Sequence, residues 1–485
     1  MAGTIVWFYV LLSSTAQPAQ GDNQRMRTVD QIAAELQGYD PNALPAGVVN
    51  EFLAQLVVPI TATEQVDLFA ALGRVLASDV VSPISVPPHD NSAMDGFALN
   101  GADLKAHGPS HFNVVGTALA GKAWQGGVQA GECVKIMTGA IMPQGLDTVV
   151  PQELCTSSQR PAAWTIEVKA GVLRTGDNRR FAGEDLMQGA PALHQGDLLS
   201  PAALGLLASL NIGQVDVVRK LKVAYFSTGD EVLSLGEAPR EGAIYDSNRY
   251  TVHGMLTRLG VEVIDMGVVG DNPALLEAAF RSAAVQADAI ITSGGVSVGE
   301  ADHTKAMMAQ LGSEVQGGGV AFWKIAMRPG RPMAVGRIAK GSFKPNLEDK
   351  SPSGPSKYCT SSYENNSSLL FGLPGNPVAV MVTMLAFVRP ALLRMMGANP
   401  AKYCSVPLYL PAHSTEPLRK KPGRTEYQRG RVTRAADGTM QVKTTGNQGS
   451  GVLSSMVQAN GLIVLHHNQG NVAAGDVVDV LMLDV

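Results

Sequence analysis

A glycine-rich segment, TSGGVSVGEAD at residues 292–302, directly follows an apolar run typical of a buried strand. Its glycines would let backbone N–H groups approach a phosphate closely, and Asp302 would hold a hard cation beside that phosphate. A plain strand-to-helix turn explains the same pattern equally well. Our candidate substrate-binding residues in this segment are Gly294, Gly295, Ser297 and Gly299.

Two other expected strands end in carboxylates. Glu231 closes the segment STGDE at 227–231, and Asp271 follows the strand-like run 261–269. Ligands of open α/β folds bind at the carboxyl edge of the sheet, so we expect Glu231, Asp271 and Asp302 to face one crevice. A cation would relieve their mutual repulsion, which predicts Mg²⁺ held jointly by these carboxylates and a substrate phosphate. Helix capping is the alternative role for each acid taken singly.

Three cations surround a rigid turn in FWKIAMRPGRP at 322–332, namely Lys324, Arg328 and Arg331. The planar donor fork of arginine suits tetrahedral oxyanions, and solvated surface charge is the alternative explanation of such a cluster. The segment LPGNPV at 373–378 precedes a long apolar helix, whose free N–H groups would also receive an anion. Strand-and-turn structure alone would explain two polar, glycine-rich segments, GRTEYQRG at 423–430 and GNQGSG at 446–451.

The charge and cysteine content exclude several classes of protein. The formal net charge is −4, so no overall positive field exists to attract nucleic acid or an anionic membrane. The four cysteines are widely spaced and form no CxxC pair, which argues against a zinc knuckle or a disulfide framework. We therefore expect a cytoplasmic protein with small-molecule ligands and neither a nucleic-acid nor a membrane partner.

The apolar run at residues 5–12, IVWFYVLL, is too short to span a bilayer, which needs roughly 20 residues. It has no basic segment before it, and Met26 is a second plausible start. We predict that residues 1–25 are a disordered leader, with an export signal as the alternative.

The elements that must position these residues change in type along the chain. Apolar positions at helical spacing predict a helix over 66–77, and short Val- and Thr-rich runs from about 81 to 181 predict an all-β module. From about 221 strand-like and helical runs alternate, which is typical of a parallel α/β sheet. Short alternating runs after 397 predict a C-terminal β-barrel-like domain. The fold class is therefore multidomain α/β plus β.

Taken together, the motifs resemble the molybdopterin molybdotransferase family, which includes MoeA and the gephyrin E domain. The order and spacing of the motifs match the family over roughly residues 26–485, and so many motifs in register make the resemblance specific. The motifs are SAMDGFA at 92–98, MTGA at 137–140, AGED at 182–185, STGDE at 227–231, GGVSVGEADHTK at 294–305, FWKIAMRPGRP and LPGNPV.

The resemblance implies a homodimer with each active site between the α/β domain of one subunit and the C-terminal β domain of the other. It implies a Mg²⁺-dependent reaction in which adenylated molybdopterin and molybdate give molybdenum cofactor and AMP. It also implies as protein partners the molybdopterin adenylyltransferase and apo-molybdoenzymes.

Motif positions carry the family's site residues onto this chain. The cation-binding and catalytic carboxylates are Glu231, Asp271 and Asp302. Further cleft residues, which we group with the catalytic ones, are Asp95, Thr138 and Asp185. The molybdate- and pterin-phosphate-binding residues are Lys324, Arg328, Arg429 and Ser450, and the loop between them is shaped by Pro374 and Pro377.

With this family as a guide, we expect five parts of the chain. They are a leader (1–25), an α/β molybdopterin-binding domain (26–58 and 212–396, with a disordered insertion at 339–368), a linker or dimerisation domain (59–80 and 182–211), an inserted β domain (81–181) and a C-terminal β domain (397–485). The chain departs from the family at Arg328 and Arg331, where lysine is frequent, at Gly451, where histidine is frequent, and in the insertion.

Three other functions compete with the transferase. A gephyrin-type scaffold usually carries a fused adenylylating domain, which this chain lacks. The adenylylating molybdopterin-binding enzyme resembles only residues 221–396, and the additional modules argue against it. A nucleotide-processing enzyme that shares only the α/β domain would release AMP without molybdate.

Overall fold

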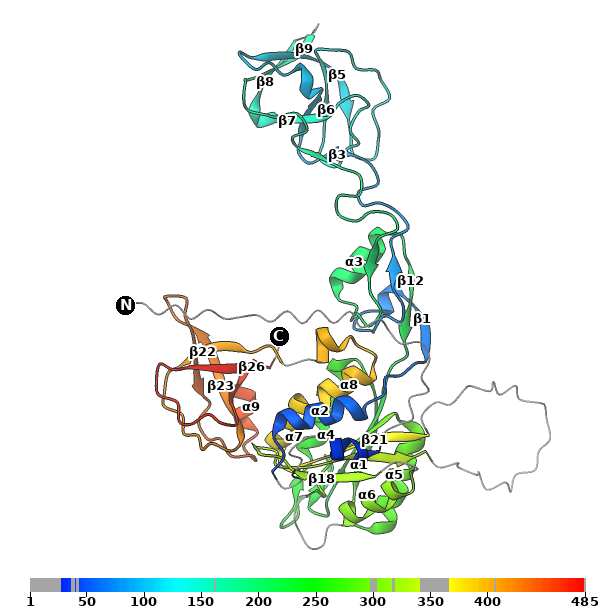
Figure 1. The fold of residues 1–485 in the computed structure, drawn as a ribbon, viewed down its shortest axis with the longest axis vertical. Coiled ribbons are helices and arrows are strands. Elements are labelled where there is room, and N and C mark those ends of the chain that lie inside the picture. Colours follow the sequence, from blue (N-terminus) through cyan, green and yellow to red (C-terminus); the bar gives the residue numbers. More distant parts are fainter. Residues whose placement is uncertain are drawn as a thin grey trace, which may run out of the picture.

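The computed structural model describes residues 28–35, 40, 43–160, 163–296, 303–315, 319–340, 366–404 and 407–483. Figure 1 shows an elongated molecule, with an all-β module at one end, a narrow linker module below it, and an α/β domain beside a β-barrel at the other end. This arrangement confirms the expected fold class. The leader at 1–25 lies outside the described residues, as does most of the insertion at 339–368.

The α/β domain is built on a six-stranded sheet in the order β16-β13-β17-β21-β20-β18. The first four strands are parallel, as the sequence predicted, but β20 runs antiparallel to both of its neighbours. The difference arises because the end of β20 and the start of β21 lie side by side, with Ala339 opposite Ser367, as in a hairpin. The strands are β13 (Lys222–Thr228), β16 (Glu262–Val269), β17 (Ala289–Ser293), β18 (Val320–Lys324), β20 (Pro332–Ala339) and β21 (Ser367–Leu373), and a short ribbon of β14 (Val232–Leu233) and β15 (Ile244–Tyr245) follows β13.

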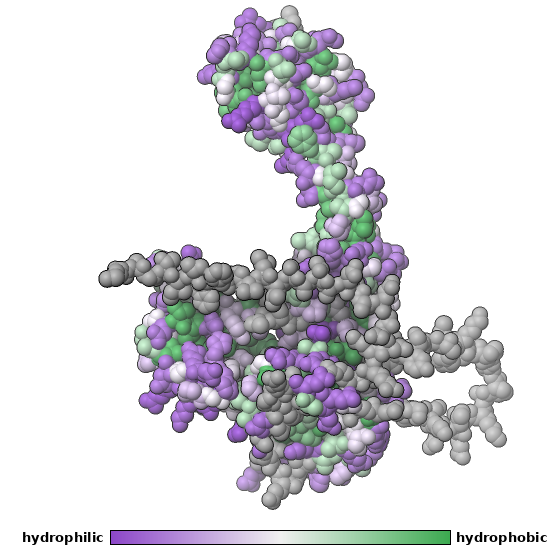
Figure 2. Space-filling model, in the orientation of Figure 1, coloured by the Kyte–Doolittle hydropathy of each residue, from purple (hydrophilic) through white to green (hydrophobic). Residues whose placement is uncertain are grey.

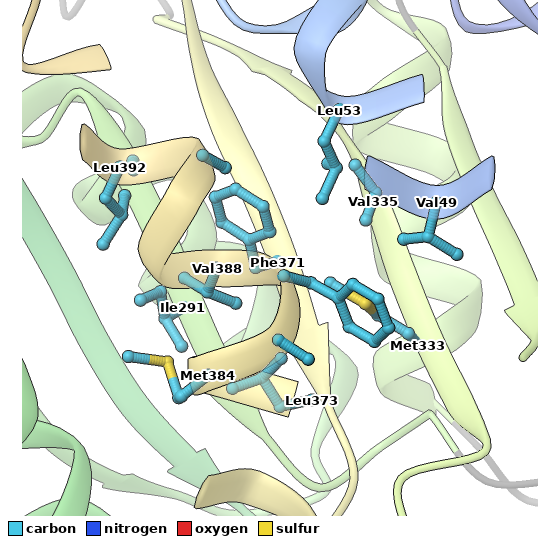
Figure 3. Close-up of a cluster of buried hydrophobic side chains, with 14 of the residues drawn as sticks. Val49, Leu53, Ile291, Met333, Val335, Phe371, Leu373, Met384, Val388 and Leu392 are labelled. Atoms are coloured by element: carbon cyan, nitrogen blue, oxygen red, sulfur yellow. The ribbon is translucent and has the colours of Figure 1, made fainter. Parts of the chain in front are cut away.

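Helices cover both faces of this sheet because its side chains alternate between two apolar layers. Tyr225 packs in the layer under α2, α4, α7 and α8, part of which Figure 3 shows, with Phe371 and Val388 near its centre. Phe226 packs in the opposite layer against Phe280, with ring centroids 5.0 Å apart. The helices are α1 (Val29–Glu35), α2 (Ala46–Leu56), α4 (Ser247–Leu259), α5 (Pro273–Gln286), α6 (His303–Ser313), α7 (Pro377–Thr383) and α8 (Arg389–Met395).

The long apolar helix expected near 378–396 is present, but a π-helical segment, Met384–Val388, separates α7 from α8. Pro390 lacks an N–H group and its ring crowds the preceding turn, so a wider turn relieves the clash. Within the described residues, this helix alone is long and apolar enough to cross a membrane. It is 72% buried inside the protein, which is typical of a core helix.

The prediction of a helix over 66–77, in the linker module, is wrong. The structure has strand β1 (Thr63–Asp67), a 3₁₀ turn (Leu68–Ala70) and isolated β-bridges at Val75 and Leu76. Strand pairing with β12 (Gln214–Val218) satisfies the backbone of β1, and Gly73 at φ +72° interrupts the helical run. Since β12 belongs to this module, we propose that the α/β domain begins after 218. The module also contains β2 (Val80–Val81), β11 (Pro191–Leu193) and α3 (Pro201–Ser209).

The distal module is all-β, as expected, with a six-stranded sheet in the order β7-β4-β6-β5-β9-β8. Phe97 and Trp164 meet edge to face in its core, with centroids 6.0 Å apart. Its strands are β3 (Asn91–Ser92), β4 (Gly96–Leu99), β5 (Ser110–Ala118), β6 (Glu132–Ile136), β7 (Thr148–Pro151), β8 (Cys155–Arg160), β9 (Ala163–Val168) and β10 (Arg179–Arg180), with 3₁₀ turns at Gly101–Asp103 and Gln152–Leu154.

The C-terminal domain is a closed barrel, because β23 pairs with both β24 and β25 and the chain of pairs β24-β22-β26-β25 completes the circle. Strand β19 (Met327–Arg328) of the α/β domain joins the start of β23 in parallel and so connects the two domains. The barrel elements are β22 (Leu410–Ser414), β23 (Thr425–Arg434), β24 (Met440–Thr444), β25 (Gly461–Leu465), β26 (Val477–Met482) and α9 (Ser454–Gln458), preceded by a π-helical turn (Pro400–Cys404).

The ends of the expected insertion meet in the β20–β21 hairpin. Ala339 pairs with Ser367, and the Lys340 N–H donates to the Asn366 carbonyl over 2.8 Å. We predict that replacing 341–365 with Asn-Gly leaves the fold intact. It should raise the free energy of unfolding by about 2 kcal/mol, because each halving of a loop saves about 0.6 kcal/mol. Thermal unfolding checks this, and a large loss of stability would contradict it.

Candidate active site

The carboxyl ends of the parallel strands form one edge of the sheet. Thr228 is level with Val269, and Ser227, Ser293 and Leu373 lie in register across three strands. Strand β18 runs in the same direction as β21, because both are antiparallel to β20, so Lys324 also ends at this edge. The loops that carry the predicted carboxylates, glycines and cations therefore all leave from one edge.

Carboxylates gather where β13 and β16 end. The Asp271 N–H donates to the Asp230 carboxylate over 2.9 Å, and the Glu231 carboxylate folds back over Gly229, which has φ +133°. Burial raises the pKa of Asp271 above its usual value, and the negative charges of Asp230 and Glu231 raise it further. The structure thus brings Glu231 and Asp271 together as predicted and adds Asp230. Asp302 lies outside the described residues.

The turn after β17 requires glycine at two positions. Gly294 has φ +93°, and a Cβ there would lie 2.6 Å from the Thr228 carbonyl oxygen. Gly295 has φ +65° and packs directly on Thr304. The side-chain hydroxyls of Thr292 and Thr304 flank this turn. Both residues are fully buried, and neither Oγ1 has a hydrogen-bond partner within the described part of the chain. Ser297 and Gly299, the other predicted residues of this segment, lie outside the described residues.

The loop after β21 touches both the glycine turn and the C-terminal barrel. Pro374 and Pro377 bracket a turn in which the Gly375 carbonyl accepts a hydrogen bond from Asn248 Nδ2 over 2.7 Å. The Val378 N–H, at the start of α7, donates to the Ser450 carbonyl over 3.1 Å. The expectation that this helix start is free for an anion therefore needs correction, because Ser450 of the same chain occupies one of its donors.

Cations lie at the other end of the edge, beyond β21. Lys324 ends β18 and is half-buried, whereas Arg328 is exposed on β19, level with Glu426 of the barrel. Arg424 donates to the Glu426 carboxylate over 2.7 Å, so that carboxylate is already paired. Arg328 thus remains at the junction of the α/β domain and the barrel, where a tetrahedral anion would find its donors.

Arg429 is buried at this junction and holds the glycine-rich loop of the barrel. Its guanidinium donates to the carbonyls of Asn447 and Gly449 over 3.2 and 2.9 Å and to the Ser455 hydroxyl over 3.0 Å. Burial lowers the pKa of Arg429 to about 10, and the nearby positive charge of Arg328 contributes. Ion pairs within the described residues include no carboxylate bound to Arg429. Its charge therefore adds to the positive potential beside Arg328.

The three remaining predicted residues lie far from this edge within one chain. Thr138 donates to the Asp95 carboxylate through its N–H and its hydroxyl, over 2.7 and 2.8 Å, and these bonds lower the pKa of Asp95. The Asp185 N–H donates to the Val86 carbonyl over 3.1 Å. All three belong to the distal module or its base, which Figure 1 shows separated from the α/β sheet by the linker. One chain does not bring them to the carboxylates.

The carboxylates suit a cation that is shared with substrate better than a complete protein cage. Among the described residues, no group of three His, Cys, Asp or Glu side chains is arranged to hold a metal ion. Mg²⁺ commonly binds through one or two carboxylates, waters and substrate phosphates. The raised pKa of Asp271 reflects repulsion that such a cation would remove. The residues present therefore fit Mg²⁺.

Comparisons with known proteins cover nearly the whole of this architecture. Family models match residues 48–211 (MoeA N-terminal region, domain I and II), 224–394 (probable molybdopterin binding domain) and 411–483 (MoeA C-terminal region, domain IV). The molybdopterin molybdenumtransferase of Haemophilus influenzae is 39% identical over 89% of this chain and 96% of its own length. The chain belongs to the molybdopterin molybdenumtransferase family.

Two further similarities agree with this family. The molybdopterin molybdenumtransferase of a Nostoc species is 34% identical over 87% of this chain and 89% of its own length. The crystal structure of a molybdopterin biosynthesis MoeA protein from Pyrococcus horikoshii matches with a TM-score of 0.68 and 25% identity, over 91% of this chain and all of that one. The resemblance found in the motifs is thus confirmed, and with it a place in molybdenum cofactor biosynthesis.

Proposed function

We propose that this transferase inserts molybdate into adenylated molybdopterin and releases AMP, giving the molybdenum cofactor. The layout of the sheet edge supports this proposal most directly. Carboxylates stand at the ends of β13 and β16, cations stand beyond β18, and the turns after β17 and β21 lie between them. A hard-cation site and an oxyanion site thus flank a glycine turn able to approach phosphate.

Each group at the edge has a distinct task in this proposal. Gly294 and Gly295 let the backbone approach the adenylate phosphates, and Pro374 and Pro377 shape the loop beside them. Lys324 and Arg328 bind and orient molybdate. Glu231 and Asp271, with Asp302 proposed from the family motif, would hold Mg²⁺, which neutralises charge on the phosphates and orients them. Ser297 and Gly299 join the phosphate-binding set on the same motif.

The direct test mixes the protein with adenylated molybdopterin, Mg²⁺ and molybdate. AMP is then measured by chromatography, and the pterin product is offered to an apo-molybdoenzyme. We expect AMP release together with reconstituted enzyme activity, both dependent on Mg²⁺. AMP release without any product active in reconstitution would favour a nucleotide-processing enzyme, and absence of both would favour a scaffold.

We further propose a homodimer formed through the linker module. Helix α3, PAALGLLAS, has no charged residue although much of it faces solvent in one chain. Phe69 is fully exposed beside it and Leu72 is 56% exposed. Figure 2 shows apolar residues along this narrow module. An uncharged apolar helix face of this kind is typical of a buried interface. The resemblance implied a partner's barrel at each site, but the barrel of the same chain already lies at this edge. We propose instead that a partner's distal module supplies its Asp95, Thr138 and Asp185 to this edge.

We predict that Phe69→Asp dissociates the dimer. Loss of a central aromatic contact and burial of a charge should weaken association by at least about thirtyfold, by the usual energies of interface anchors. Sedimentation velocity at micromolar concentration measures this. Leu408→Asp, which changes an equally exposed leucine outside the module, is the matched control. A wild-type chain that sediments as a fully active monomer would refute the dimer.

The substrates, partners and compartment follow from the same proposal. Adenylated molybdopterin would be passed on by the molybdopterin adenylyltransferase, and the product would go to apo-molybdoenzymes. Cys133 and Cys155 are free thiols, which fits the reducing cytoplasm. Pull-down with an adenylyltransferase in the presence of substrate would test the first partner.

A further inference from the structure

A cavity of about 150 Å³ lies at the edge of the sheet opposite to the candidate active site. It is lined by residues next to the amino ends of the parallel strands, among them Arg219 before β13, Asp288 before β17 and Ser367 at the start of β21. Lys340, directly after the antiparallel β20, also lines it. This cavity is therefore separated from the candidate active site by the length of the strands.

The lining carries more positive than negative charge. Asp288 is matched by Arg219, whose two terminal nitrogens donate to the two carboxylate oxygens over 2.8 Å each. Burial opposes ionisation of Asp288, but Arg219 and the Lys222 N–H bring its pKa below the usual value. Lys340 Nζ lies 3.8 Å from the same carboxylate. One carboxylate thus faces three cations, the third being Arg337.

Of these three cations, Arg337 is the one whose charge is least balanced by negative groups in the described residues. It is 5% exposed, and its Nε is buried with no hydrogen-bond partner among the residues that the structure describes. One terminal nitrogen donates to the Leu56 carbonyl over 2.6 Å, and the other lies 3.5 Å from the Ser367 hydroxyl. No ion pair in the described part of the chain gives Arg337 a carboxylate. A buried charge left in this state is costly unless an anion completes it.

The size of the cavity limits the anion. Sites for nucleotides and other drug-sized ligands occupy about 300–1,000 Å³, which is well above the volume of this cavity. Apolar side chains of Ile60, Leu369 and Met395 also line the cavity, which is partly open to solvent. We propose that the cavity binds one small inorganic oxyanion of the phosphate or sulfate class, held by Arg337 and Lys340 and independent of the catalytic edge.

Calorimetric titration in an anion-poor buffer of low ionic strength tests the proposal. Phosphate and sulfate should each bind once per chain at this site, also in an Arg328→Ala background that weakens the catalytic edge. Arg337→Gln, whose amide still reaches toward the Leu56 carbonyl, should weaken binding by about ten- to a hundredfold, the usual effect of a lost charge-assisted hydrogen bond. Lys340→Ala changes a second, more exposed lining residue and should also weaken anion binding.

Three controls make the result decisive. Lys222→Ala, whose side chain is at the same edge and pairs with Glu262, should not change binding. Glucose 6-phosphate should not bind if the cavity admits only the free ion. Selenate soaked into crystals should give an anomalous peak beside Arg337. Unchanged binding in both cavity variants, equal weakening by Lys222→Ala, or tight binding of the phosphate ester would overturn the proposal.

Discussion

Replacing Asp271 with asparagine should stabilise the cation-free protein and at the same time remove Mg²⁺-dependent AMP release. The ionised Asp271 lies against Asp230 and Glu231, so an uncharged side chain of the same shape removes repulsion. The backbone hydrogen bond from Asp271 to Asp230 does not depend on the side chain and should persist. If Asp271 binds Mg²⁺ as proposed, its loss removes several kcal/mol of transition-state stabilisation, so AMP release should fall by about a hundredfold or more.

The measurement combines thermal unfolding with and without Mg²⁺ and an AMP assay. Mg²⁺ should raise the melting temperature of wild type. The Asp271→Asn variant should have a higher melting temperature without Mg²⁺ and change little when Mg²⁺ is added. Glu262→Gln is the matched control, because Glu262 begins the same strand at the opposite edge and should leave both properties unchanged. A variant with a lower melting temperature and full activity would contradict both the repulsion and the proposed role.

The same pKa shift gives the variant a pH dependence. The folded-state pKa of Asp271 lies above its usual 3.8, so the folded state favours the proton. Wild type therefore avoids the repulsion below the usual pKa, where Asp271 is protonated, and loses this stability as pH rises through the raised folded-state pKa. Without cation, the variant's advantage in melting temperature should therefore be absent below about pH 4 and fully developed near neutral pH.

The sequence predicted the strand ends well because each is marked by a local change from buried apolar residues to glycine or a carboxylate. Glu231 and Asp271 were found in this way and do lie together. Asp230, in the same STGDE segment, was not assigned to the cation-binding set, because only the close approach of the β16 loop brings it next to Asp271. Thr292 and Thr304 could not be identified, since burial without a hydrogen-bond partner depends on tertiary packing.

Other errors arose where long-range pairing outweighed a local pattern. Apolar spacing at 66–77 predicted a helix, yet β12, about 150 residues later, pairs with β1 and draws this segment into a sheet. Likewise, the start of α7 has the residues of an anion site, but the Ser450 carbonyl from the barrel reaches it. No pattern within either segment contains this information, because contacts between distant segments decide the outcome.

For Arg429 the sequence showed the type of residue but not the environment in which its side chain lies. The sequence grouped it with Lys324 and Arg328 as an anion-binding cation. In the structure its donors hold the carbonyls of Asn447 and Gly449, whereas Arg328 is exposed. We therefore expect different effects from mutating Arg429 and Arg328. Comparing the two variants separates a structural role from a binding role.

We predict that Arg429→Met destabilises the barrel, while Arg328→Ala leaves it stable. Methionine fills volume but removes the donors bound by the Asn447 and Gly449 carbonyls, and each of these part-buried hydrogen bonds is worth about 1–2 kcal/mol, so the barrel should lose about 2–4 kcal/mol. Hydrogen exchange in β23 and the 446–450 loop measures this locally, since a multidomain chain need not unfold in one step.

Arg328→Ala should instead raise the molybdate concentration needed for half-maximal cofactor formation by about ten- to a hundredfold, the usual effect of one lost charged hydrogen bond. Excess molybdate should restore the rate, because no buried group is stranded by this change. If Arg328→Ala lowered hydrogen-exchange protection as much as Arg429→Met, both arginines would be structural. The oxyanion would then have to depend on Lys324 alone, whose single ammonium cannot provide the two-donor fork that a tetrahedral oxyanion favours.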